Sequence, residues 1–172
     1  MSLAPPAARP AMRRTTTAGF RLRGRTYKAV LTAHILTSVG WFGAAIVVAV
    51  LVFWAGTTSD KVLATSIYRV LANLPRVSIP LGIAAALTGG VLSVGTTWGL
   101  FKNWWVIAKI LITIAVVVTD AVVISHVARD ALASGVADRA LYDGSIAHVV
   151  ALTVATVISV FKPKGKTPWQ AV

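Results

Sequence analysis

The chain has 172 residues, of which 56% are hydrophobic and 13% charged, and its mean hydropathy is +0.77. A soluble domain of this length would carry more charge and shorter apolar runs, so the composition indicates a single membrane domain. The formal net charge is +12, but no basic groove interleaved with aromatic residues predicts binding to nucleic acid. The absence of cysteine excludes disulfides, thiol catalysis and cysteine-ligated zinc or iron–sulfur sites.

The first 26 residues, Met1 to Thr26, are rich in Ala, Pro, Arg and Thr and show no apolar face. We expect a disordered basic tail that lies near anionic lipid headgroups. The first apolar span follows, roughly from Tyr27 to Trp54, and has aromatic residues at both ends that suit the membrane interfaces. Because it is about twice as long as the apolar region of a signal peptide, we expect it to stay as a membrane anchor.

The connection from Ala55 to Val77 contains a short amphipathic pattern that starts after Asp60, a residue suited to capping a helix, and ends near Pro75. We predict a short helix here that lies on the membrane surface or re-enters the membrane. The second span then runs roughly from Ser78 to Trp98. Small residues at every fourth position let helix backbones approach closely in lipid, and they form two series: Ser78, Gly82, Ala86 and Gly90, and Ala85, Gly89 and Ser93.

The third span runs from Trp104 to His126, and about 20 apolar residues are enough to cross a bilayer as a helix. Lys109, Thr113 and Asp120 share one face of this helix, since the residues from Lys109 to Asp120 make about three turns. Ionisable groups facing lipid are costly, so this face is expected to turn toward other helices or a watery cavity.

The fourth span is predicted roughly from Tyr142 to Phe161, which makes residues 27–161 one transmembrane domain, followed by a basic tail from Lys162 to Val172. Eleven Lys and Arg residues lie in the two tails and the loop after the second span, against five in the other two connections. Because basic residues favour the inner side of a membrane, we predict a multi-pass protein of the plasma membrane with both termini cytoplasmic.

Span boundaries also place the polar residues at two depths, at a rise of about 1.5 Å per residue. His34 and Lys109 should lie at a similar depth near the cytoplasmic side. Asp120 and His148 should lie together nearer the opposite side, with His126 at the border. The simplest interpretation is structural: polar contacts between helices at His34 and at Asp120 with His148, an interfacial His126, and Lys109 extending to the headgroups.

These residues also allow functional interpretations. A neutral imidazole can ligate haem iron, copper or zinc, and a carboxylate can fix its second nitrogen. Two of the histidines His34, His148 and His126 could therefore hold a haem or a metal ion. Asp120 and His148 could instead form a proton relay.

Three segments resemble an uncharacterised family of actinobacterial four-span membrane proteins: residues 34–44, the turn at residues 95–105 and the tail at residues 160–169. A histidine followed by Trp-x-Gly in the first span, and Trp-Trp-x-x-x-Lys in the third, are more distantly similar to the copper-resistance D and HemJ-type protoporphyrinogen oxidase group. By that resemblance, His34 would match the haem-associated histidine and Lys109 the lysine of the third span.

The sequence therefore predicts an all-α fold, a four-transmembrane-helix bundle with a short amphipathic helix between spans 1 and 2. No nucleophile elbow or phosphate-binding glycine loop is present, so we expect a non-enzymatic protein with a mainly structural polar interior. One alternative is a b-type haem or metal-binding redox protein using His34 with His148 or His126. Another is a small transporter using Lys109 and Asp120. The expected partners are the lipid bilayer, anionic headgroups at the basic tails, and a second copy or another membrane protein.

Overall fold

The computed structural model describes residues 21–96, 102–163 and 165–168, is 87% helical and has no strand within these ranges. Its elements are α1 (Gly24–Thr57), α2 (Lys61–Asn73), α3 (Pro75–Gly95), α4 (Trp104–Thr119), the π-helical turn η1 (Asp120–Ile124), α5 (Ser125–Ser134) and α6 (Arg139–Phe161). In the described part of the chain, four helical segments are long and apolar enough to cross a membrane: Gly24–Thr57, Lys61–Gly95, Trp104–Ser134 and Arg139–Phe161. The predicted all-α four-helix bundle is confirmed.

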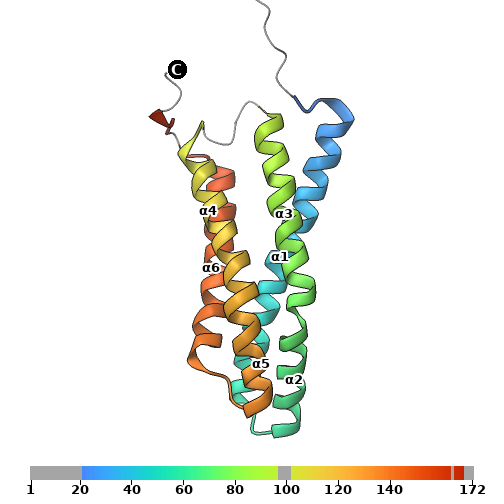
Figure 1. Ribbon diagram of the computed structural model, residues 1–172, viewed down its shortest axis with the longest axis vertical. Helices are drawn as coiled ribbons and strands as arrows, with labels where there is room; N and C mark the ends of the chain where they lie inside the picture. Colours follow the sequence, from blue (N-terminus) through green and yellow to red (C-terminus); the bar gives the residue numbers. More distant parts are fainter. Residues whose placement is uncertain (1–20, 97–101, 164, 169–172) are drawn as a thin grey trace, which may run out of the picture.

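The four segments run up and down along one long axis (Figure 1), so that α1 begins and α6 ends at the same end of the bundle. We call this the terminal end, and the opposite end, built by α2 and α5, the closed end. Helix α2 lies in line with α3, and α5 lies in line with α4. Helix α1 packs mainly against α3 and α6, while α4 packs against α6 and less extensively against α3. The bundle is therefore made of two helix pairs, α1 with α3 and α4 with α6, and the packing of α1 against α6 joins them.

The predicted amphipathic helix between the first two spans is confirmed as α2, and its cap is Asp60. One side-chain oxygen of Asp60 accepts hydrogen bonds from the backbone N–H of Val62 at 2.9 Å and of Leu63 at 3.1 Å. The helix is not a separate surface segment, however, because only Leu74 stands between it and α3. Pro75 occupies the first turn of α3, where a missing N–H breaks no helical bond, so the chain continues in nearly the same direction.

The helical segment that contains the predicted third span is longer than that span. It passes through η1 into α5 and ends at Ser134, beyond His126. Gly135 then adopts the left-handed conformation at φ 75°, and its N–H donates to the carbonyl of Ala131 at 2.9 Å, which closes the helix. Helix α6 starts at Arg139, earlier than predicted. The predicted end of the second span at Trp98 lies outside the described residues, and α3 ends at Gly95.

Two apolar clusters hold the bundle together. The larger one fills the closed end and comprises Val52, Ala55, Ala64, Ile67, Tyr68, Leu71, Ile124, Ala128, Ala131 and Leu141. The smaller one lies nearer the middle and comprises Trp41, Ala85, Val116 and Leu152. Around both, large apolar side chains such as Leu36, Leu87 and Leu111 face outward, as expected of a surface in contact with lipid tails.

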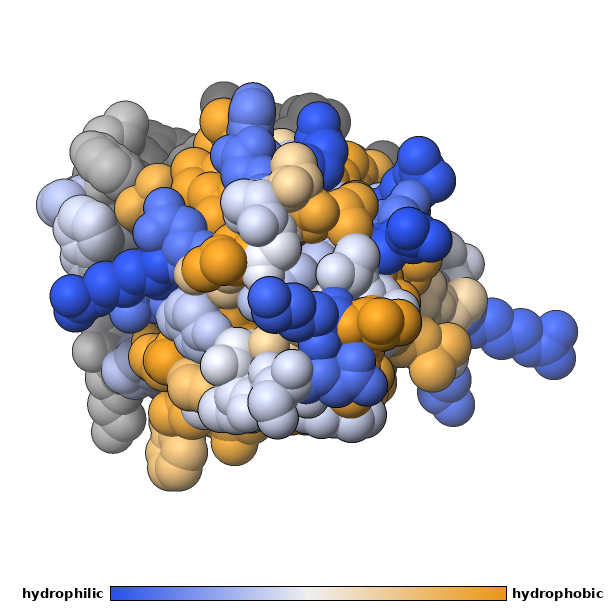
Figure 2. Space-filling model, turned by 90° about the horizontal axis from the view of Figure 1, so that it is seen from below, coloured by the Kyte–Doolittle hydropathy of each residue, from blue (hydrophilic) through white to orange (hydrophobic). Residues whose placement is uncertain are grey.

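The helices are longer than a bilayer is thick. Helix α1 has 34 residues, or about 51 Å at about 1.5 Å per residue, against about 30 Å of hydrocarbon. At the closed end, α2 and α5 carry basic and acidic residues. Figure 2 shows this end covered by polar and charged side chains with apolar ones between them. The closed end therefore has the composition of a segment that projects from the apolar layer.

Most of the basic N-terminal tail expected from the sequence lies outside the described residues, as do the last residues of the C-terminal tail. The described parts of both tails contact helix ends. The N–H of Leu22 donates to the carbonyl of Gly95 at 2.8 Å, and the N–H of Thr167 donates to the carbonyl of Lys102 at 3.2 Å. Each tail is thus held against a neighbouring helix end at the terminal end of the bundle.

Truncating Leu141 tests the packing of the closed end. Its side chain is 0% exposed, so Leu141→Ala should lower the free energy of unfolding by about 2–5 kcal/mol because the cavity cannot collapse fully. Leu111→Ala is the matched control, since that side chain is 62% exposed on the outer surface and should cost much less. Unfolding of the purified protein in mixed micelles measures both changes. Equal losses in the two variants would contradict this packing.

Candidate functional site: a cleft at the terminal end and a buried polar cluster

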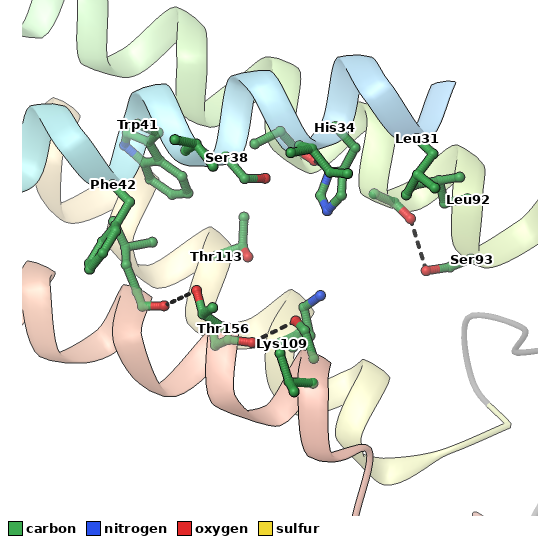
Figure 3. Close-up of a pocket in the computed structure, with 18 of the residues that line it drawn as sticks. Leu31, His34, Ser38, Trp41, Phe42, Leu92, Ser93, Lys109, Thr113 and Thr156 are labelled. Atoms are coloured by element: carbon green, nitrogen blue, oxygen red, sulfur yellow. Dashed lines mark hydrogen bonds between the residues drawn. The ribbon is translucent and has the colours of Figure 1, made fainter. Parts of the chain in front are cut away.

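A cleft of about 440 Å³ opens between α1, α3, α4 and α6 in the terminal half of the bundle. Its volume lies within the range of about 300–1,000 Å³ that is usual for small-molecule sites. Apolar and aromatic side chains form most of its wall, and several polar side chains project into it (Figure 3). The polar members are Tyr27, His34 and Ser38 from α1, Ser93 and the following Thr96 from the α3 side, Lys109 and Thr113 from α4, and Thr156 and Ser159 from α6.

The hydrogen bonds of His34 define which of its ring nitrogens faces the cleft. Its Nδ1 lies 3.1 Å from the carbonyl of Ala85 and 3.1 Å from the hydroxyl of Thr88. That hydroxyl donates to the carbonyl of Ala84 at 2.6 Å, so it can only accept from His34. Nδ1 therefore carries the proton and donates to both oxygens. Nε2 keeps its lone pair, and Figure 3 shows the ring directed into the cleft.

A glycine on α3 makes room for this imidazole. A Cβ atom at Gly89 would lie 3.0 Å from Cε1 of His34, whereas a Cβ atom at the adjacent Gly90 would meet nothing within 4 Å. The same relation recurs one level deeper, where a Cβ atom at Gly82 would lie 2.8 Å from the indole of Trp41. The small residues at these two positions of the second span thus receive the rings of α1, which is a more specific role than close backbone packing.

Lys109 projects from α4 into the same cleft, and Figure 3 shows its ammonium group directed toward His34. The chain has five acidic residues, all aspartates and all described, and none of them lines the cleft. The cleft therefore presents one positive charge without an opposite charge in its wall.

A second polar group is buried deeper in the bundle. The hydroxyl of Ser78 on α3 donates to Oδ2 of Asp120 at 2.7 Å, and both side chains are buried. Asp120 is the first residue of η1, so the hydrogen bond joins α3 to the third span where that span changes from α to π geometry. Ser145 and His148 of α6 line the same small cavity as this pair.

Two of the sequence-derived residues share the cleft and two share the buried cavity. His34 and Lys109 line the cleft, while Asp120 and His148 line the deeper cavity. His126 lies apart, on the surface of α5, where its side chain is 74% exposed and Nδ1 lies 3.7 Å from Oδ2 of Asp130.

The geometry bears directly on the alternatives drawn from the sequence. His34 lines the cleft, His148 lines the deeper cavity and His126 is exposed on α5, so the structure places the three histidines in different surroundings. Within the described ranges, no three His, Asp or Glu side chains are grouped to hold a metal ion. Lys109 and Asp120 share a helix face but line different cavities, which Trp41 and Leu152 separate.

Sequence reasoning missed the partners of these residues. Ser78 was assigned to helix packing, but it is the hydrogen-bond donor of Asp120. Ala85 was placed only in a series of small packing residues and Thr88 was not singled out, yet both orient His34. A usable signal was present for Ser78, because a hydroxyl at the depth of an intramembrane carboxyl is a natural partner for it. No pattern in the sequence singles out a backbone carbonyl such as that of Ala85.

The chain matches no family model, no curated protein and no solved structure. Membership of the four-span family therefore remains a prediction from the sequence. The same holds for the distant similarity to the copper-resistance D and HemJ-type group. The fold and the two polar sites define a helical bundle of the multi-pass membrane class.

Enlarging Gly89 tests the position of the His34 imidazole. Gly89→Val should displace the imidazole and break the Nδ1 hydrogen bond to Ala85, because the added methyl groups would occupy the place of the ring. Nitrogen NMR of labelled histidine should show the loss of the Nδ1–H tautomer. Gly90→Val, on the neighbouring and open position, should leave the signal unchanged. An unchanged His34 signal in Gly89→Val would contradict the assigned geometry.

Proposed function

We propose that this protein is a non-enzymatic multi-pass membrane protein whose cleft binds an amphiphilic anion. The observation that carries the proposal is the ammonium group of Lys109 in a cleft that no carboxylate lines. A lysine in the apolar part of a membrane costs about 2.5–3.5 kcal/mol on insertion scales. An anionic group bound beside Lys109 would offset that cost, and the hydroxyl of Thr113 would supply a further hydrogen bond.

The rest of the wall supports an apolar body for the same ligand. Trp41, Phe42 and Trp105 line the cleft together with Leu31 and Leu92. Ligand sites of this kind are mainly apolar and aromatic, with a few polar groups that fix the orientation of the ligand. A ligand with a carboxylate or phosphate on an apolar chain or ring system would suit the cleft. Its anionic group would pair with Lys109, and its apolar body would contact the aromatic and aliphatic side chains.

We further propose that the terminal end faces the cytoplasm and that the membrane is the plasma membrane. Both helix ends that carry the tails lie at this end of the bundle (Figure 1), and the tails contain most of the Lys and Arg residues. The excess of basic residues supports an inner location. In this orientation the cleft would open toward the cytoplasmic leaflet, whose anionic lipids the tails would also attract.

Binding of a brominated fatty acid tests the proposal, because bromine quenches tryptophan fluorescence and Trp41 and Trp105 line the cleft. Saturable quenching should weaken by about tenfold to a hundredfold in Lys109→Gln, as expected for the loss of a charge-assisted hydrogen bond. Lys102→Gln, which removes an exposed lysine at the same end, should leave the affinity unchanged. Equal binding of the brominated neutral alcohol, or no effect of Lys109→Gln, would reject the anion site.

Haem b is a second candidate ligand, and the orientation of His34 favours it. A ligating histidine usually donates its other ring N–H to a carbonyl or carboxylate, as Nδ1 of His34 does to Ala85. His34 would then hold the iron through Nε2, and Lys109 would pair with a carboxylate of the porphyrin. Bound haem would supply one-electron chemistry, and the protein would supply the ligand, the counter-charge and the apolar wall.

Optical spectra distinguish the haem candidate from the wider proposal. Protein purified with added haem should show a Soret band that His34→Gln removes. His148→Gln and His126→Gln should retain the band, because those histidines do not line the cleft. If no band forms while the brominated fatty acid still binds, haem is excluded and the amphiphile proposal stands. A band that survives in His34→Gln would contradict the assigned axial ligand.

A further inference from the structure

The deeper polar cavity contains a carboxyl group that shares its cavities with no Lys or Arg side chain. Asp120 is 6% exposed, and its known hydrogen-bond donor is the neutral hydroxyl of Ser78. The two small cavities beside Asp120 are lined by apolar side chains, Ser78, Ser145 and His148, and no Lys or Arg lines either of them. A buried carboxylate is costly unless a positive group pairs with it, so a proton taken up within this cluster would stabilise it.

His148 supplies the second and independent observation. Its side chain is only 9% exposed, and Nε2 is buried without a hydrogen-bond partner in the described structure. The ring lines the same cavity as Asp120. A buried polar atom left unpaired costs about 1–3 kcal/mol, and in native proteins such an atom commonly marks an unseen water, an ion or a functional group.

The cavity between these groups has the size of one water molecule. Its volume is about 10 Å³, and about 10–15 Å³ of such space is the minimum that holds a water. A water there has polar partners in Nε2 of His148 and the carboxyl of Asp120. The hydroxyl of Ser145 donates to the carbonyl of Tyr142 at 2.8 Å and keeps its acceptor capacity, so it is a third partner.

We propose that Asp120, His148 and one water between them form a proton-binding site inside the bundle. In the deprotonated form, the carboxylate faces a neutral imidazole and the cluster carries one negative charge. Uptake of one proton from bulk water makes the cluster neutral, and that proton is shared between the carboxyl and the imidazole through the water. Ser78 holds one carboxyl oxygen in both forms. The proton then belongs to the pair and not to either residue alone.

Besides Asp120 and His148, the described residues that line the two small cavities include no titratable side chain. The residues that face the cluster from α1 are Trp41, Ala45 and Val48. Two neutral hydroxyls also face it, that of Ser78 from α3 and that of Ser145 from α6. The cavity toward the closed end adds only apolar residues of α2, η1, α5 and α6. Two other cations on the third span lie elsewhere: Lys109 lines the cleft, and Arg129 donates to the carbonyl and hydroxyl of Ser125.

The donor set favours a proton over a metal ion. Hard cations such as Ca²⁺ or Mg²⁺ take six or more oxygen ligands, and zinc sites need at least three protein ligands. The cluster offers one carboxyl, one imidazole and hydroxyls, and no three His, Asp or Glu side chains group together among the described residues. A site for sodium would leave Nε2 of His148 unused, since that ion also prefers oxygen.

The site is separate from the cleft, so this inference does not rest on the proposed function. Trp41 and Leu152 line both cavities and form the wall between them. The indole of Trp41 is held in place against Gly82, where a Cβ atom would lie 2.8 Å from the ring. Binding of an amphiphile to the cleft and binding of a proton behind this wall can therefore fail or succeed independently.

Infrared difference spectroscopy of the full chain in lipid nanodiscs tests the proton site, with spectra recorded between about pH 5 and pH 8, the range in which histidine titrates. Isotope labels on aspartate and histidine identify the carboxyl and imidazole bands. We expect both bands to change at the same midpoint, with one proton taken up in total. Asp120→Asn and His148→Gln should each abolish the coupled step.

The chain provides a matched control in His126 and Asp130, a solvent-exposed imidazole and carboxyl pair on α5. Asp130→Asn and His126→Gln should leave the coupled step intact. Ser78→Ala keeps both titrating groups and should shift the midpoint without removing the step. Separate midpoints for the two bands in the wild-type protein would overturn the proposal, and so would a dependence of the step on sodium. The wild-type measurement decides even if a variant fails to fold.

Discussion

The hydrogen bond from Ser78 to Asp120 is the contact on which the arrangement of the bundle depends. In hydrocarbon, a polar side chain must find its partner within the protein, because neither water nor lipid tails supply one. Asp120 meets this constraint through α3, its neighbour in the bundle. The contact fixes the rotation of the third span, so that Lys109 and Thr113, on the same helix face, also turn inward and line the cleft.

The same contact marks the boundary between two halves of different character. On its closed-end side, α2, α5 and the ends of α1 and α6 enclose a continuous apolar cluster that includes Leu71, Ile124 and Leu141. On its terminal side, the pair of α1 and α3 stands apart from the pair of α4 and α6, which leaves space for the cleft. A packed half that holds the helices in register allows the other half to remain open to a ligand.

Composition and periodicity predicted the fold class, the four spans and the capped helix after Asp60, because helical length and apolar content act locally along the chain. The sequence did not predict that α2 would continue into α3 or that the third span would extend to Ser134, since tertiary packing in the closed end decides where those helices stop. Helical spacing correctly indicated that the face of Lys109 and Asp120 turns inward. The hydrogen-bond partners of His34 and Asp120 depend on how the neighbouring helices are rotated, and no pattern within one helix predicts that rotation.

The inward orientation of this face is the central claim, and the absence of cysteine from the chain allows a direct test of it. Single cysteines at Thr113, which lines the cleft, and at Leu111, which is 62% exposed on the outer surface, lie on opposite sides of the same turn of α4. The measurement is the rate at which each reacts with a water-soluble thiol reagent in intact proteoliposomes. The structure predicts reaction at Thr113→Cys and protection by lipid at Leu111→Cys. Protection at Thr113→Cys with reaction at Leu111→Cys would contradict it.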